Sequence, residues 1–445
     1  MADGTGSEGK SRTLVLCFDG TSNEYDSENT NVVKLYALLK KDNFDEQLCY
    51  YQAGIGTYFE PGAVSPLLRV GATLLDYAFA AFLDWHVLDG YKFLMQNYRV
   101  GDKICIFGFS RGAYTARALG GLLYKVGLLP RDNFSQVSFA YKMYQREDKE
   151  GLRLCSGFKQ TYCRSVKIDF MGVWDTVASV GIISGRTLPF TNSNSSIKTF
   201  RHALSLDEHR AKFRPNNYHR IPRSKKPSKN DPDHTTPSEM HVQIGKTRNS
   251  TTKDNGVVSP VPDEPGEFAK QTGKSAGTAL DEAGLPDDVQ EVWFVGCHSD
   301  VGGGAVSNDT PHSLANISLR WMVREAIKAD CGIQFDDDAL IRASLDLDPE
   351  PSQTEIDMDD QDAMAPIHDE LKKHKIWWLL ELIPLHFQWQ NEDGEWKKDW
   401  SCHFGRGRDI QTSTPRFHIT VEKRMKAMGY VPKAAWKKGT ELYMH

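Results

Sequence analysis

The sequence predicts an α/β fold in which a mostly parallel β-sheet is flanked by helices. Short apolar runs, which indicate buried strands, alternate with helical segments along the chain. Each run is followed by a turn rich in small or polar residues. We expect the strands at Leu14–Phe18, Lys103–Phe107, Val166–Val173 and Val292–Val295, and helices at Asn31–Leu39, Thr73–Asn97 and Ala113–Val126.

Composition narrows the class of protein. Of the 445 residues, 40% are hydrophobic and 25% are charged, which suffices for a large core. The net charge of −5 lacks the basic excess of a nucleic-acid-binding protein. No apolar run reaches the roughly 18 residues of a membrane-spanning helix, and residues 1–11 have no secretory h-region. Eight cysteines without a Cys-x-x-Cys pair indicate reduced thiols. We therefore expect a cytoplasmic protein with no metal site, no cofactor and no nucleic-acid partner.

The chain is expected to form a single domain over residues 12–445, preceded by a flexible tail at 1–11. Within it, residues 224–290 hold one aromatic residue, Phe268, where the chain average of 11% would give about seven. Such a segment cannot bury enough apolar surface to offset the entropy of ordering, so it is interpreted as a mostly disordered insertion. Residues 335–445 are expected to be a helical and irregular addition.

The motif Gly108-Phe109-Ser110-Arg111-Gly112 lies between a predicted strand and a predicted helix. That context is typical of a nucleophile elbow, whose sharp turn needs small residues two before and two after the serine. The following helix would point its positive end at the serine hydroxyl. The alternative is a glycine-flanked turn with an idle serine.

A serine nucleophile needs a base and an orienting carboxylate. In α/β-hydrolases these follow in the chain order Ser, acid, His. Asp175 and His298 each follow a predicted strand in that order after Ser110. Asp300 and Asp207 are alternative acids, although Asp300 could instead brace its loop by accepting backbone N–H bonds. Among the other histidines, His418 is the alternative base, and His202, His209 and His219 are expected in a helical or loop region.

The backbone N–H of Arg111 is the first expected donor of an oxyanion hole, and Gly20-Thr21, after the first strand, would supply the second. The alternative for Gly20-Thr21 is an ordinary turn. A phosphoaspartate mechanism is disfavoured, because Cys17 stands where its first aspartate would be required. The glycine run after His298 lacks the Lys-Ser/Thr ending of a phosphate loop.

Two further segments, Trp377–Pro384 and Leu67–Leu83, are strongly apolar. They are interpreted as core helices or, alternatively, as a lid or a lipid-contacting face.

Taken in order, these motifs resemble the DUF2235 family, which is related to the catalytic domain of type VI secretion Tle1-like phospholipase effectors. The resemblance rests on Leu14–Asn23, Asn97-Tyr98, Phe107–Arg117, Trp174–Val177, His202–Glu208 and Val292–Gly304. It implies an α/β-hydrolase fold and a serine esterase or phospholipase with Ser110 as nucleophile, Asp175 as acid and His298 as base. From the extent of the matching motifs, we expect no counterpart of the large membrane-docking region of the bacterial effectors.

The sequence thus predicts a serine hydrolase that cleaves carboxylic esters, lipid esters among them, through an acyl-enzyme. Peripheral contact with a membrane is compatible with this function. The alternative is a catalytically silent hydrolase-fold protein that binds a partner. The particular ester and the oligomeric state are left open.

Overall fold

A computed structural model describes residues 11–21, 23–54, 72–177, 188, 195–218, 288–390 and 396–445. Its centre is an eight-stranded sheet with the order β10-β9-β6-β5-β4-β3-β1-β2, in which every neighbouring pair is parallel. The strands are β1 (Thr13–Phe18), β2 (Gln47–Gln52), β3 (Lys103–Phe109), β4 (Ile168–Trp174), β5 (Ile197–Ser205), β6 (Asp288–Phe294), β9 (Arg416–His418) and β10 (Leu442–Met444). The predicted α/β class is confirmed.

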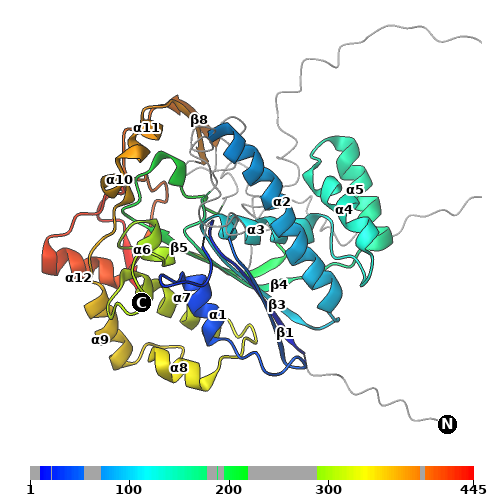
Figure 1. The fold of residues 1–445 in the computed structure, drawn as a ribbon, viewed down its shortest axis with the longest axis horizontal. Helices are drawn as coiled ribbons and strands as arrows, with labels where there is room; N and C mark the ends of the chain where they lie inside the picture. The colour runs from blue at the N-terminus through cyan, green and yellow to red at the C-terminus, as the bar shows by residue number, and fades with distance from the viewer. Residues whose placement is uncertain are drawn as a thin grey trace, which may run out of the picture.

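Helices cover both faces of the sheet (Figure 1). One layer contains α2 (Ala72–Asn97), α3 (Ser110–Lys125), α4 (Phe134–Gln145) and α5 (Lys149–Tyr162). The other contains α1 (Asn31–Leu38), α6 (His298–Gly302), α7 (Leu314–Lys328), α8 (Asp337–Ala343), α9 (Gln353–Asp362) and α12 (Ile419–Met428). A smaller region carries α10 (Glu370–Lys373), α11 (Trp378–Glu381) and the antiparallel hairpin β7 (Leu385–Gln390) and β8 (Trp396–Ser401).

The apolar runs of the sequence are continuous because both faces of the central strands are buried. In β1, Leu14, Leu16 and Phe18 pack in the core on the α3 side. The alternate residues Val15 and Cys17 pack in the core on the α7 side. This two-sided burial explains why the strand sequence does not alternate between apolar and polar residues.

One central strand, β5, was not expected, because its sequence contains charged residues. Arg201 is buried and paired with Glu325 on α7, with 2.5 Å between Arg201 Nε and the carboxylate. His202 lies on this strand, so its expected placement in a helix or loop is wrong. Its ring is fully buried and bonded to Glu291 on β6. An ion pair and a hydrogen bond inside the fold thus compensate the burial of two polar residues that make this strand hard to recognise in the sequence.

The C-terminal segment is not only helical and irregular, as was expected for residues 335–445. It adds β9 and β10 to one edge of the main sheet and also forms the β7–β8 hairpin. Residues 288–290, assigned to the insertion, are the first residues of β6. The rest of the insertion and residues 1–10 lie outside the described residues, as does Leu67–Gly71. In the described part of the chain, no helix is long and apolar enough to cross a membrane.

The contact between α3 and β1 depends on a glycine. A Cβ at Gly112 would lie 2.3 Å from Phe18 O and 2.4 Å from Asp19 O. We expect Gly112→Ala to lower the free energy of unfolding by roughly 3 kcal/mol, because backbone would have to move. The matched control is Gly157→Ala at an exposed position of α5, where an added Cβ would meet nothing within 4 Å. It should stabilise the helix by up to about 1 kcal/mol. Denaturant titration of both variants measures their free energies of unfolding. Equal values would contradict the close approach of α3 to β1.

Candidate functional site

Ser110 lies at the abrupt turn from β3 into α3. Its φ of 58° is in the left-handed region, which is rare for a residue with a Cβ. The flanking glycines permit this turn: a Cβ at Gly108 would lie 2.6 Å from Gly112 O. The predicted strand-turn-helix context of the serine is therefore present.

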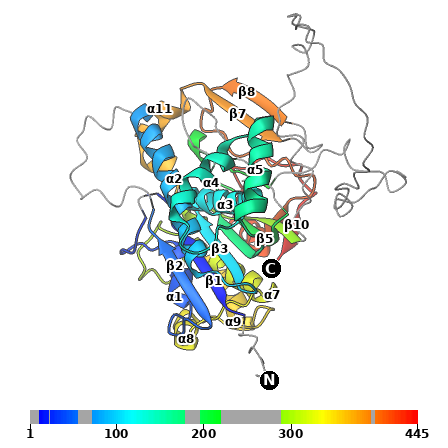
Figure 2. The same cartoon turned by 90° about the vertical axis from the view of Figure 1, so that its right-hand side faces the viewer.

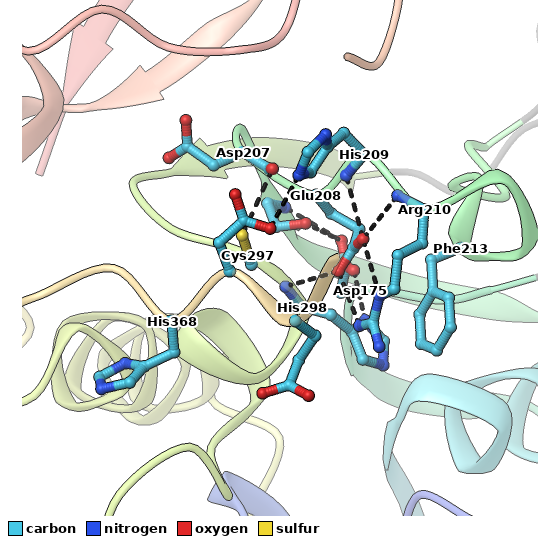
Figure 3. A network of polar contacts seen from close by, with 12 residues as sticks. Asp175, Asp207, Glu208, His209, Arg210, Phe213, Cys297, His298 and His368 are labelled. Carbon is cyan, nitrogen blue, oxygen red and sulfur yellow. Dashed lines mark hydrogen bonds and ion pairs between the residues drawn. The ribbon is translucent and has the colours of Figure 1, made fainter. Parts of the chain in front are cut away.

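Three side chains that follow β3, β4 and β6 form one hydrogen-bonded chain. Ser110 Oγ lies 2.8 Å from His298 Nε2, and His298 Nδ1 lies 2.5 Å from Asp175 Oδ2. Asp175 follows β4 and His298 opens α6 after β6 (Figure 3). All three residues are buried. The structure thus brings together the serine, histidine and aspartate singled out in the sequence, in the order that proton transfer from the serine requires.

The electrostatics of the chain keep the histidine neutral and the aspartate charged. Burial lowers the pKa of His298 below its usual value, and the opposing attraction of Asp175 does not fully offset this effect. Burial would raise the pKa of Asp175, but Arg408 and His298 reverse the effect and hold that pKa well below its usual range. At neutral pH, His298 Nε2 can therefore accept the Ser110 proton.

Arg408 is a site residue that sequence reasoning missed. Its Nη1 and Nη2 lie 2.5 and 2.9 Å from the two carboxylate oxygens of Asp175. Arg408 Nη1 also donates to Ser205 Oγ, while the Ser205 amide donates to Asp175 Oδ1. Arg408 comes from the segment before β9, more than 200 positions from Asp175, and no motif in the sequence marked it.

The segment after β5 forms one wall beside His298. Glu208 accepts from the His298 amide at 3.3 Å and from Arg210 Nη2 at 2.8 Å. Phe213 then packs edge-on against the His298 ring with centroids 4.9 Å apart. Phe109, the residue before Ser110, packs on the same ring at 4.6 Å. These contacts fix the orientation of the imidazole.

The alternative acids have structural roles. Asp300 accepts from the amides of Cys297 and His368, so it braces its loop. Asp207 accepts from the Gly296 amide and from the Tyr430 hydroxyl. Neither carboxylate is hydrogen-bonded to the His298 ring among the described contacts, so Asp175 alone matches the expected geometry.

The alternative histidines are also engaged elsewhere. His418 is buried against Phe294, with its Nδ1 bonded to Thr420 Oγ1. His209 bonds to Asp369 at 2.8 Å. His202 Nε2 accepts from the Thr176 amide, which fixes the backbone next to Asp175. His219 lies outside the described residues.

The turn after β1 lies against the serine, as predicted for an oxyanion hole. A Cβ at Gly20 would lie 3.2 Å from Ser110 Cβ. The Gly20 amide, however, donates to Asp19 Oδ1 at 2.7 Å, so its assignment as an oxyanion donor needs correction. Burial raises the pKa of Asp19 to about 6, although hydrogen bonds from Gly20, Tyr51 and Thr30 oppose that rise.

Two predicted donors are left for the oxyanion hole. Thr21 follows Gly20 in this turn, and its Oγ1 is buried without a hydrogen-bond partner in the described structure. Arg111 lies in the first turn of α3, where backbone N–H groups point toward the helix N-terminus. These donors act without a metal ion. Among the described residues, no three or more His, Cys, Asp or Glu side chains are grouped so that they could bind a metal ion.

A parallel α/β sheet with Ser, Asp and His side chains at the carboxyl ends of its strands has the layout of an α/β-hydrolase-like fold. The family model of the catalytic domain of type VI secretion system Tle1-like phospholipase effectors matches residues 12–325, more than half of the chain. The protein belongs to this family, whose description as phospholipase effectors indicates hydrolysis.

Three similar proteins each cover most of this chain. An uncharacterized Saccharomyces cerevisiae protein, YEL023C, is 29% identical over 542 residues, covering 93% of this chain and 79% of the yeast protein. A crystal structure of an uncharacterized Pseudomonas aeruginosa protein is 16% identical, with a TM-score of 0.38, over 82% of this chain and 52% of that one. This chain thus spans about half of that protein's length. A Tle1 effector, solved bound to the VgrG spike of the type 6 secretion system, is 15% identical with a TM-score of 0.37, over 89% and 92%.

The contact between Arg408 and Asp175 predicts how the pKa of His298 changes when the charge of Arg408 is removed. Arg408→Gln removes the charge that partly neutralises Asp175, so Asp175 should attract a proton on His298 more strongly. We expect the pKa of His298 to rise by about one unit, measured by NMR titration of the imidazole. The matched control is Arg406→Gln, because Arg406 is exposed and donates to the carbonyls of His403 and Cys402. A folded Arg408→Gln protein whose His298 pKa falls or stays constant would contradict the coupling.

Proposed function

We propose that this protein is a serine hydrolase that cleaves carboxylic esters, with lipid esters as the favoured class. The observation that carries the proposal is the hydrogen-bonded chain Ser110–His298–Asp175 at the carboxyl ends of three parallel strands. Membership in a family of phospholipase effectors supports the choice of lipid esters.

In the proposed reaction, the Ser110 oxygen attacks the ester carbonyl as its proton passes to His298 Nε2. The negative charge on the carbonyl oxygen would be held by the backbone N–H groups of Thr21 and Arg111. His298 then gives the proton to the leaving alkoxide, which departs as an alcohol and leaves an acyl group on Ser110. A water molecule, deprotonated by His298, releases the carboxylic acid and restores the serine.

The role of Asp175 in this proposal is to hold His298 in the tautomer that presents a lone pair to Ser110. The carboxylate accepts a hydrogen bond from Nδ1–H, so the ring proton stays on Nδ1 and Nε2 carries no hydrogen. It would also stabilise the imidazolium that forms during attack. Cytoplasmic location belongs to the same proposal and is supported by the eight free thiols of the chain.

The direct test is covalent labelling by a fluorophosphonate, which reacts with activated serines. The wild-type protein should be labelled at Ser110 and should hydrolyse p-nitrophenyl esters. Ser110→Ala should lose both the label and, by roughly a thousandfold or more, the turnover. Ser135→Ala, at an exposed position of α4, is the matched control and should retain both.

A double variant tests whether Ser110 and His298 act together in one catalytic step or contribute to the rate independently. Ser110→Ala combined with His298→Ala should be about as inactive as either single variant, because the two groups act in one step. If the folded wild-type protein is not labelled by the fluorophosphonate, the alternative is favoured, in which the protein is catalytically silent and binds a partner.

A further inference from the structure

Large apolar side chains are exposed around α11. Leu379 and Leu382 are 63% and 58% exposed, and Trp378, Ile383 and Phe404 are also exposed. We call these five residues the α11 patch. Four of them lie within six consecutive positions, whereas isolated exposed apolar residues are normal on a protein surface.

The patch joins two segments of the chain. The Phe404 amide donates to Glu381 O at 3.3 Å, and Cys402 Sγ lies 3.3 Å from Leu382 O. Gly405 contacts the Trp378 indole, since a Cβ there would lie 3.1 Å from the ring. Phe404 therefore lies beside α11 and extends the apolar surface.

The exposed position of α11 is fixed by a buried carboxylate. Glu381 is 1% exposed and accepts from the amides of Ala211 and Gly405, at 2.6 and 2.9 Å, and from His403 Nδ1 at 2.8 Å. Turning α11 to bury its leucines would break these bonds and leave a buried charge without partners. The fold therefore holds the apolar side chains outward.

The patch adjoins the proposed active site. Trp377, the residue before α11, packs edge-on against Phe213 with centroids 5.6 Å apart, and Phe213 contacts His298. Both views show α11 and the β7–β8 hairpin at one end of the molecule and α8 at the opposite end (Figures 1 and 2). A surface that binds α11 would thus lie close to Ser110.

Cationic side chains border the patch. The side chains of Lys372 and Lys373 on α10 are 76% and 67% exposed, and Lys375 is also exposed. The nearby Asp369 is shared with Lys433 and His209, so it neutralises these lysines only in part. Glu370, which is partly exposed, lies 3.7 Å from Lys373, and an ion pair at the surface is screened by water and stabilises little.

We infer that the α11 patch docks on the surface of a lipid bilayer that contains anionic headgroups. Tryptophan and leucine side chains partition into the boundary between headgroups and acyl chains. Lysines beside them are attracted to anionic lipid. The inference deepens the proposed function, because it places the lipid surface beside the serine, but the docking itself does not require hydrolysis.

The test is cosedimentation with vesicles of phosphatidylcholine that contain phosphatidylserine. The double variant Leu379→Ser and Leu382→Ser should lower the partition coefficient by about tenfold or more, because two apolar side chains are lost from the lipid contact. The matched control, Ile341→Ser with Leu347→Ser, alters two exposed residues in and beside α8 and should bind as the wild type does. Lys372→Gln with Lys373→Gln should weaken binding to these vesicles but not to pure phosphatidylcholine.

Hydrolysis of the soluble ester p-nitrophenyl butyrate, measured in parallel, separates the two proposals. The patch variant should retain this activity while losing vesicle binding. Absence of ester hydrolysis in a wild-type protein that binds vesicles would refute the proposed function alone. The docking inference is overturned if the wild type fails to bind vesicles or if the patch variant binds them equally well. It is also overturned if the wild type is a dimer without lipid and the patch variant is a monomer, since a second copy would then cover the patch.

Discussion

The Asp175 carboxylate is the point on which the arrangement of the site depends. It is fully buried, and an isolated charge in that position would be strongly unfavourable. Arg408 binds both of its oxygens, Ser205 donates its amide and hydroxyl, and His298 donates from Nδ1. These partners come from distant parts of the chain, so the compensation of one charge also fixes the relative positions of those segments.

Other buried carboxylates act in a similar way around Asp175. Asp207 and Glu208 bind backbone amides of the Gly296–His298 turn, and Glu381 binds the amide of Ala211. Each carboxylate joins a loop to a neighbouring segment at a strand end, where backbone amides would otherwise lose hydrogen bonds. These acidic residues thus serve mainly to hold the backbone, and among the described residues only Asp175 is a carboxylate hydrogen-bonded to the His298 ring.

The C-terminal segment belongs to the site, although the family match ends at residue 325. Arg408 binds Asp175, Tyr430 and Lys433 bind Asp207, and Glu381 positions α11 next to Phe213. A parallel sheet alone would bring Ser110, Asp175 and His298 to one edge. The later segment supplies the cation that makes the buried aspartate favourable and the aromatic surface beside it.

The strands that carry the site were predictable from the sequence, because β1, β3, β4 and the end of β6 are apolar runs followed by turn residues. The sequence also determined the elbow, since Gly108 and Gly112 are required by close backbone approaches around Ser110. The partners of these residues depend on contacts between distant segments, which form when the chain folds. Arg408 was unpredictable, because its role is set by a contact across 233 positions. β5 was hidden by Arg201 and His202, because the ion pair of Arg201 with Glu325 and the hydrogen bond of His202 with Glu291 exist only in the folded chain. The three-residue strands β9 and β10 are too short to produce a pattern. For Trp377–Pro384, the sequence could not distinguish a core helix from a surface, because exposure depends on the buried bonds of Glu381.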